Sequence, residues 1–219
     1  MKSKFFLLLF CLGLSLTSFS EGTFYFVFLN TNPDKDVISE DSAQYLQNAH
    51  LKNIERLYNM GKIVAAGPFA EKGGIYVFEV DTEEEVWEHL ATDEGIQAKR
   101  WKLEVFPFDM QFGTICKIPE QYEMATYSFI RYIPRRGTNT KKTMLNKERI
   151  RFLSEYKNNI VVQGTFGADK GGILLLDGLL TDSVKTILSK DPAIVSGLNT
   201  YTIRNLWIAE GTWCKESRE

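Results

Sequence analysis

Histidine and cysteine are scarce in this chain of 219 residues, which has two histidines and three cysteines. They form no cluster with the spacing of a zinc site or of another transition-metal site, so we expect no metal. A serine-dependent catalytic triad would have to use the same two histidines, and the chain has no Gly-x-Ser-x-Gly motif. Composition therefore argues against the commonest metal-dependent and serine-dependent enzyme sites.

Positive charge is not in excess either. The formal net charge is −2, and it becomes −4 when Lys2 and Lys4 are removed with the first twenty residues. Nucleic-acid binding needs a basic face, so we expect no nucleic-acid partner. The paired glycines Gly73 and Gly74 lie between two predicted strands, which indicates a hairpin loop and not a phosphate-binding loop.

The first twenty residues have the pattern of a secretory signal peptide. Two lysines are followed by an uncharged apolar run over 5–16, which is too short to span a bilayer comfortably, and by the small-x-small sequence 18–20 before Glu21. No later segment reaches transmembrane length. We expect export to a periplasm or to the medium, with no membrane attachment after cleavage.

Residues 70–116 and 168–214 are two copies of one sequence. They align without a gap at a spacing of 98 residues, and 12 of the 47 positions are identical, where average composition gives roughly three. This period is too long for solenoid repeats of about 20–50 residues. We therefore predict two tandem domains, 21–116 and 126–219, joined by a linker at 117–125.

In each copy, strand-forming runs, helix caps and turn glycines predict the order strand, helix, strand, strand, helix, strand. The predicted elements are 23–30, 39–59, 62–66, 75–80, 82–91 and 101–110 in the first copy, and 126–133, 143–157, 160–163, 173–177, 181–189 and 200–208 in the second. This is the βαββαβ order of the α+β ferredoxin-like fold, with both helices on one face of the sheet. We expect the two helix-free faces to pack together, giving an intramolecular pseudo-dimer.

The two cysteines outside the signal peptide, Cys116 and Cys214, occupy the same position in the two copies. Equivalent atoms of a two-fold pair meet only near the axis, so a disulfide between them would have to cross that axis. It would close a loop of about 100 residues and contribute up to ~4.7 kcal/mol in the chain-entropy model. Two separate thiols are the alternative.

His50 lies on the inward stripe of the first predicted helix, together with Leu46, Ile54 and Leu57. Asp93 follows the second predicted helix on its buried side. An imidazole oriented by a carboxylate is suited to general acid–base chemistry near neutral pH. A buried structural histidine bonded to a core-edge aspartate is the alternative.

Several motifs resemble the YCII-related domain family in order and spacing. They are His50-Leu51, Gly67-Pro68-Phe69, Gly73-Gly74-Ile75, Glu83–Glu85, Asp93 and Phe106-Pro107-Phe108, with 191–198 in the second copy. The resemblance implies a dimeric α+β barrel and an active site that maps onto His50 and Asp93. This chain departs from the family pattern at Glu94, where proline is usual, and the second copy has no histidine.

Two functions compete on this sequence. The first is a cofactor-independent lyase or isomerase that moves a proton on a small organic molecule through His50 and Asp93. Its pocket would be lined by Trp101, Phe106 and Phe108, for which filling of a two-sheet core is the alternative. The second is a non-catalytic module that binds a small ligand or a protein, in which the dyad is structural or a relic. A purely structural pseudo-dimer is a third possibility. We expect a monomer or a weak homo-oligomer.

Mass spectrometry of the exported protein tests the predicted signal cleavage and the predicted disulfide. Signal cleavage predicts a mature chain that begins at Glu21. On reduction, a mass gain of two hydrogen atoms identifies the bond between Cys116 and Cys214, and an unchanged mass identifies two free thiols. A mature chain that retains residues 1–20 would contradict the signal peptide.

Overall fold

The computed structural model describes residues 23–135, 142–167, 170–178 and 181–215. The signal peptide predicted at 1–20 lies outside these residues. Within the described part of the chain, no helix is both long enough and apolar enough to cross a membrane.

The first repeat is a four-stranded antiparallel sheet covered on one face by helices. In chain order its elements are β1 (Thr23–Thr31), α1 (Glu40–Asn59), β2 (Ile63–Pro68), β3 (Gly74–Val80), α2 (Glu83–Leu90), α3 (Glu94–Gln97) and β4 (Trp101–Pro107). The strand order across the sheet is β2-β3-β1-β4. This is the predicted ferredoxin-like arrangement, with one additional short helix, α3.

The second repeat has the same arrangement and gains a strand from the first. Its elements are β7 (Met124–Pro134), α4 (Lys142–Ser154), β8 (Ile160–Thr165), β9 (Gly172–Leu176), α5 (Thr181–Leu188), α6 (Pro192–Val195) and β10 (Asn199–Ala209). The sheet order is β10-β7-β9-β8-β5, where β5 (Asp109–Phe112) follows directly after the first repeat. Two short strands, β6 (Thr114–Ile115) and β11 (Trp213–Cys214), pair separately.

Side-chain caps set the helix starts that the sequence predicts. The Ser39 side chain accepts a hydrogen bond from the Ser42 amide at the start of α1, and the Thr82 side chain accepts one from the Glu85 amide at the start of α2. Each bond satisfies an amide that has no partner within its helix. The predicted inward stripe of α1 is also confirmed, since His50 and Leu57 are buried.

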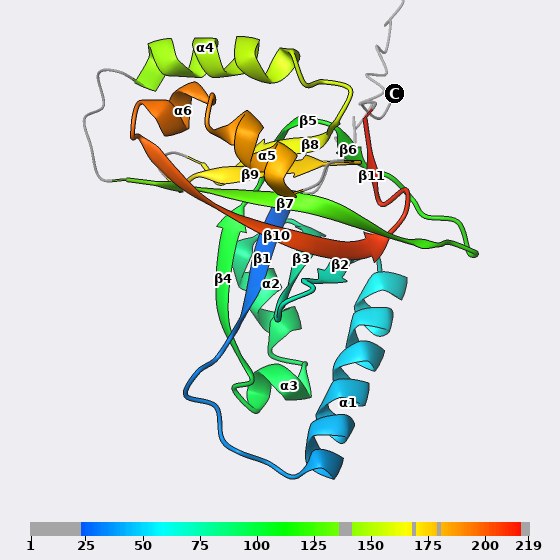
Figure 1. The fold of residues 1–219 in the computed structure, drawn as a ribbon. Coiled ribbons are helices and arrows are strands. Elements are labelled where there is room, and N and C mark those ends of the chain that lie inside the picture. The colour runs from blue at the N-terminus through cyan, green and yellow to red at the C-terminus, as the bar shows by residue number, and fades with distance from the viewer. Residues whose placement is uncertain (1–22, 136–141, 168–169, 179–180, 216–219) are drawn as a thin grey trace, which may run out of the picture.

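The two sheets pack face to face, as predicted, and the helices lie on the outer sides (Figure 1). The core between the sheets contains residues from both repeats and is rich in phenylalanine. Phe166, from the second repeat, is 1% exposed, and its ring lies 5.4 Å from that of Phe26 and 4.8 Å from that of Phe106. Each outer face has a smaller core of its own under its helices.

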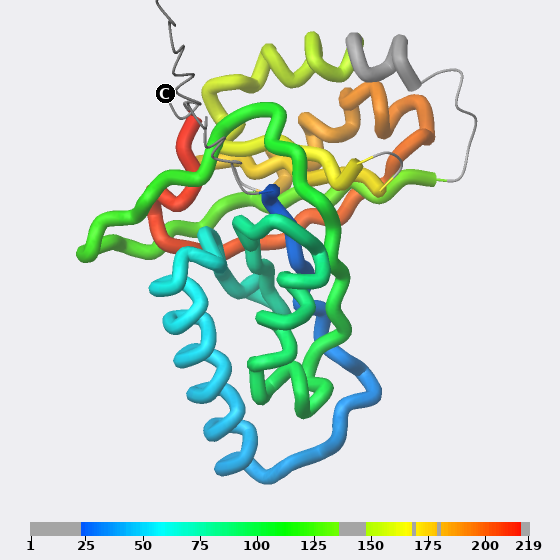
Figure 2. Tube along the Cα trace, turned by 180° about the vertical axis from the view of Figure 1, so that it is seen from behind, coloured from blue at the N-terminus to red at the C-terminus, as the bar shows by residue number. Residues whose placement is uncertain are grey.

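Each repeat also reaches the edge of the other sheet. Strand β5 pairs with β8, and at the opposite side the Ala70 amide donates to the Asn205 carbonyl of β10 at 2.9 Å. Glycines make these approaches possible: a Cβ at Gly67 would collide with the Trp207 carbonyl, and one at Gly164 with the ring of Phe108. These contacts close a barrel from both sides. Figure 2 shows the arrangement of the two repeats from behind.

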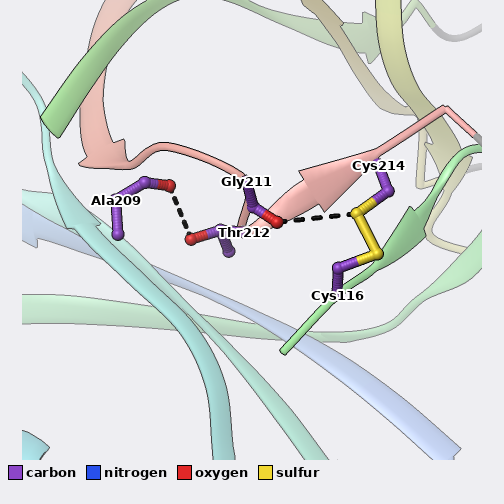
Figure 3. The surroundings of a disulfide bond; sticks show 5 residues. All are labelled: Cys116, Ala209, Gly211, Thr212 and Cys214. Carbon is purple, nitrogen blue, oxygen red and sulfur yellow. Dashed lines mark hydrogen bonds between the residues drawn. A yellow bond between two sulfur atoms is a disulfide. The ribbon is translucent and has the colours of Figure 1, made fainter. Parts of the chain in front are cut away.

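Cys116 and Cys214 are joined by a disulfide, with their Cα atoms 6.0 Å apart. Strands β6 and β11 hold them together, since Cys214 pairs with Thr114 and Trp213 with Ile115. The Cys214 Sγ also lies 3.5 Å from the Gly211 carbonyl oxygen, and Figure 3 shows the two residues beside the disulfide. The bond therefore joins equivalent positions at the ends of the two repeats.

Replacing Phe166 tests the packing of one sheet against the other. Phe166→Ala is expected to lower the free energy of unfolding by about 3–5 kcal/mol, because it opens a cavity in the shared core. Urea denaturation followed by fluorescence measures the change. Tyr122→Ala, at a side chain that is 53% exposed, is the control and should change stability by less than about 0.5 kcal/mol. Equal effects of the two substitutions would contradict this packing.

Candidate active site

His50 and Asp93 meet on the helix-covered face of the first sheet. His50 projects from the middle of α1, and its Nδ1 lies 2.7 Å from Oδ2 of Asp93. The side chains are nearly enclosed, since His50 is 8% exposed and Asp93 is 1% exposed. The structure therefore brings together the two residues that the sequence singles out for acid–base chemistry.

The Asp93 carboxylate is held by three groups, which fix its orientation. Its Oδ1 accepts the Ile96 amide at 3.1 Å and caps the short helix α3, while Oδ2 faces His50 and lies 3.5 Å from Asn53 Nδ2. Burial raises the pKa of the Asp93 carboxyl group. The hydrogen bond and charge of His50, helped by the Ile96 and Asn53 donors, outweigh burial and bring the pKa below its ordinary value of 3.8. Asp93 is thus a carboxylate at neutral pH.

Two aromatic side chains confine the imidazole. The Trp101 ring, from β4, lies 4.4 Å from the His50 ring, and the Tyr76 hydroxyl lies 3.1 Å from Nε2 and 3.3 Å from Nδ1. A hydroxyl at nearly equal distances from both nitrogens approaches the ring across its face. Burial, and then the charge of Asp93, raise the pKa of the Tyr76 hydroxyl well above its ordinary range, so Tyr76 stays neutral.

This arrangement orients a base. Because the Asp93 carboxylate accepts, Nδ1 carries the proton of the neutral imidazole and Nε2 holds the lone pair. The same carboxylate stabilises the imidazolium that forms when Nε2 takes a proton. Nε2 is therefore the nitrogen that can take up a proton, and the Tyr76 hydroxyl lies 3.1 Å from it.

The three aromatic residues considered as pocket lining lie in two different layers of the structure. Trp101 lies against His50, but Phe106 and Phe108 lie in the core between the sheets, where Phe108 is 4% exposed and Phe106 packs on Phe166. Alternate residues of a strand face opposite sides, so Trp101 and Phe106 of β4 point to different layers. Of the three, only Trp101 adjoins the dyad, and Phe106 and Phe108 follow the core-filling alternative.

The second histidine, His89, lies away from Asp93 and contacts other side chains. His89 stacks on Phe78 with the two rings nearly parallel and 6.2 Å apart, and its Nε2 lies 3.4 Å from Oε1 of Glu85. This agrees with a packing role for His89.

Tyr76 and Asn53 are parts of the site that the sequence patterns above do not single out. Asn53 lies three residues after His50, on the same face of α1, and Tyr76 alternates with Ile75 and Val77, which face the other sheet. These periodicities are the signal that could have located both side chains.

The second repeat holds a related cluster without histidine. Arg149 of α4 lies 3.5 Å from Oδ2 of Asp191, and the Tyr132 hydroxyl donates to the same oxygen at 2.9 Å. Asp191 caps α6 as Asp93 caps α3, and the Arg149 guanidinium lies over the Tyr132 ring at 4.2 Å. Since arginine stays protonated in proteins, this cluster is a fixed ion pair and not a proton-transfer site.

No family model and no curated protein sequence matches the chain. Among solved structures, a candidate chlorite dismutase has 8% sequence identity and a TM-score of 0.52 over 86% of this chain and 94% of that chain. A heme-binding protein from Thermus thermophilus has 10% identity and a TM-score of 0.50 over 87% and 92% of the two chains. These similarities show that the chain has the dimeric α+β barrel fold.

The described residues do not fit a histidine-ligated heme. Heme iron needs an axial ligand such as a histidine nitrogen or a cysteine thiolate. Both imidazoles lie in the first repeat, where His50 is engaged by Asp93 and enclosed by Trp101, and His89 packs on Phe78. Cys116 and Cys214 are bonded to each other, and no group of three His, Cys, Asp or Glu side chains in the described part of the chain could hold a metal ion.

Asp93→Asn is expected to destabilise the protein at neutral pH by about 1.5–3 kcal/mol, the range for a hydrogen bond to a charged group. The pKa of the Asp93 carboxyl is lower in the folded chain than in the unfolded one. Its contribution is therefore present above about pH 4 and is lost as the pH falls through the folded pKa. Urea unfolding between about pH 2 and 7 should give a shallower acid decline for the variant. Identical slopes for the two proteins would contradict this role.

Proposed function

We propose that this chain is an exported YCII-like protein that catalyses proton transfer on a small organic molecule through His50 and Asp93, without a metal or organic cofactor. One observation carries the proposal: the Nδ1–Oδ2 distance of 2.7 Å to a carboxylate that is 1% exposed. A buried carboxylate in this position orients the imidazole by accepting its Nδ1 proton, which leaves Nε2 as the basic nitrogen.

The proposed reaction is of the lyase or isomerase type. Nε2 of His50 takes a proton from a carbon next to a carbonyl group, and the electron pair of the broken C–H bond moves toward the carbonyl oxygen. In an isomerase step the imidazolium returns the proton to a different atom of the same molecule. In a lyase step the enolate electron pair forms a C=C bond as the bond between the β-carbon and the leaving group breaks, and the imidazolium protonates that group. Atoms and electrons balance without an oxidant or reductant. Asp93 holds the ring and stabilises its charge throughout.

A non-catalytic binding module is the second candidate. The enclosure of His50 favours it, because the imidazole is 8% exposed and lies 4.4 Å from the Trp101 ring. The second repeat also favours a binding module, because Arg149 and Asp191 occupy the positions of His50 and Asp93 there and have no acid–base function. In this alternative the dyad stabilises the fold, and the protein binds a small ligand or a partner protein elsewhere.

The proposal includes export of the protein and its division into two domains. A signal peptide at 1–20 would deliver domains 21–116 and 126–219, with the connection at 117–125, to an oxidising compartment. The bond between Cys116 and Cys214 supports this, because disulfides persist in such compartments.

Hydrogen–deuterium exchange on small molecules tests the catalytic proposal even though the substrate is unidentified. The mature protein is incubated in D₂O with a panel of small keto acids, cyclic ketones and lactones, and proton NMR follows the loss of each C–H signal. For any active compound, His50→Gln is expected to lower the exchange rate by about 100-fold or more, the usual share of a general base.

His89→Gln is the matched control, since it makes the same change at the histidine that packs on Phe78. It should keep the wild-type exchange rate. If no compound exchanges faster with the wild type than with His50→Gln, the catalytic proposal fails. A loss of several kcal/mol of stability in His50→Gln, with no exchange in either protein, would assign His50 a structural role.

A further inference from the structure

A depression on the exposed face of α1 lies directly beside the dyad. Its lining includes Lys52, Asn53 and Arg56 from α1, and Thr92 from the segment that precedes Asp93. Tyr45 and Glu94 complete its wall. The depression is polar and lies within one turn of helix from His50.

The two cations of this depression give it a net positive charge. Glu94 is the single acidic residue among the lining side chains, and the Tyr45 hydroxyl hydrogen-bonds to it, which raises the pKa of Tyr45. Arg56 bonds to neutral acceptors, with Nη2 2.8 Å from both Asn53 Oδ1 and Thr92 Oγ1. A guanidinium fixed by neutral groups keeps its full charge available to an anion, and its planar donors suit carboxylate and phosphate oxygens.

Asn53 connects the depression to the dyad. Its Oδ1 accepts from Arg56 and from Thr92, and its Nδ2 lies 3.5 Å from Oδ2 of Asp93, the oxygen that holds His50. A ligand that draws Arg56 toward itself acts on Asn53, and through it on the carboxylate. The depression and the dyad are thus parts of one hydrogen-bonded chain.

The second repeat has lost these features. Arg149 meets Asp191 as His50 meets Asp93, so positions in α4 lie 99 residues after their counterparts in α1. At this spacing Asn53 corresponds to Phe152 and Arg56 to Glu155. The bridging amide and the cation are therefore present in the repeat that has the histidine and missing from the repeat that does not.

We propose that this depression is a binding site for a small molecule that carries a carboxylate or phosphate group, held by Arg56 and Lys52 and sensed by the dyad through Asn53. Such binding is separate from the proposed catalysis and does not depend on turnover. The anionic group lies at the α1 surface, and its effect reaches the His50 ring through Asn53 and the Asp93 carboxylate.

Titration of the folded protein with inorganic phosphate, and separately with acetate, tests the site. The measurement is proton–nitrogen NMR at constant ionic strength in sodium chloride, following the Arg56 side chain, the Asn53 amide and the His50 ring. We expect saturable shifts at all three groups with at least one probe. Arg56→Gln should weaken binding by about tenfold, the loss of one charge-assisted contact. Lys190→Gln is the control, because it removes an exposed positive charge from the second repeat.

Two results would overturn the inference: an equal affinity in Arg56→Gln and the wild type, or shifts that never saturate with either probe. A response to phosphate alone assigns the ligand to the phosphate class, and a response to acetate alone assigns it to the carboxylate class. The exchange experiment is read separately. Saturable binding without exchange keeps this site and removes the enzyme, and exchange without binding does the reverse.

Discussion

The fold depends on the burial of two helix-free sheet faces against each other. Phe26 pairs with Val77 in the first sheet, and Phe129 pairs with Leu175 in the second. Val77 and Leu175 lie 98 residues apart, so Phe26 and Phe129 are counterparts, and their rings meet 6.0 Å apart at the centre of the core. Neither sheet could leave such a face in water, because the surface would be large and apolar.

Polar contacts at the rim of this core fix how the sheets cross. Arg131 of β7 donates two hydrogen bonds of 2.8 Å to Glu104 of β4, and its guanidinium lies 4.1 Å from the centre of the Phe28 ring. On the other side Arg204 of β10 lies over Phe69. Packing of the sheets leaves the opposite faces to the helices, and this puts His50 and Asp93 on an outer layer.

The buried aspartates show what the duplication kept and what it changed. Asp93 and Asp191 both begin a short helix, so each carboxylate has a structural task that is independent of any reaction. Their partners differ: one repeat presents a titratable imidazole, and the other a permanently charged guanidinium. The two repeats therefore share a scaffold, but only the first has an imidazole, the group that exchanges protons near neutral pH, beside its aspartate.

Local patterns predicted the fold well, since caps, turn glycines and the repeat are short-range features. The dyad also followed from periodicity, because helical spacing places His50 inward. The path of the chain after β4 did not follow from local patterns. Residues 101–110 have the pattern of one strand, but β4 ends at Pro107, which lacks an amide donor, and β5 joins the other sheet. The positions of Phe106 and Phe108 depend on that long-range pairing, which no local pattern encodes.

The disulfide determines how the molecule carries mechanical load. Cys116 and Cys214 are 98 residues apart in the chain, and everything between them, including the whole second sheet except β5, lies inside the closed loop. A force applied at Thr23 and Lys215 passes through the sulfur atoms and bypasses that loop. With the bond intact only the first repeat, β5 and β6 can be extended, and reduction adds the contour length of the loop to the extensible chain. The second repeat is thus shielded from tension for as long as the disulfide is intact.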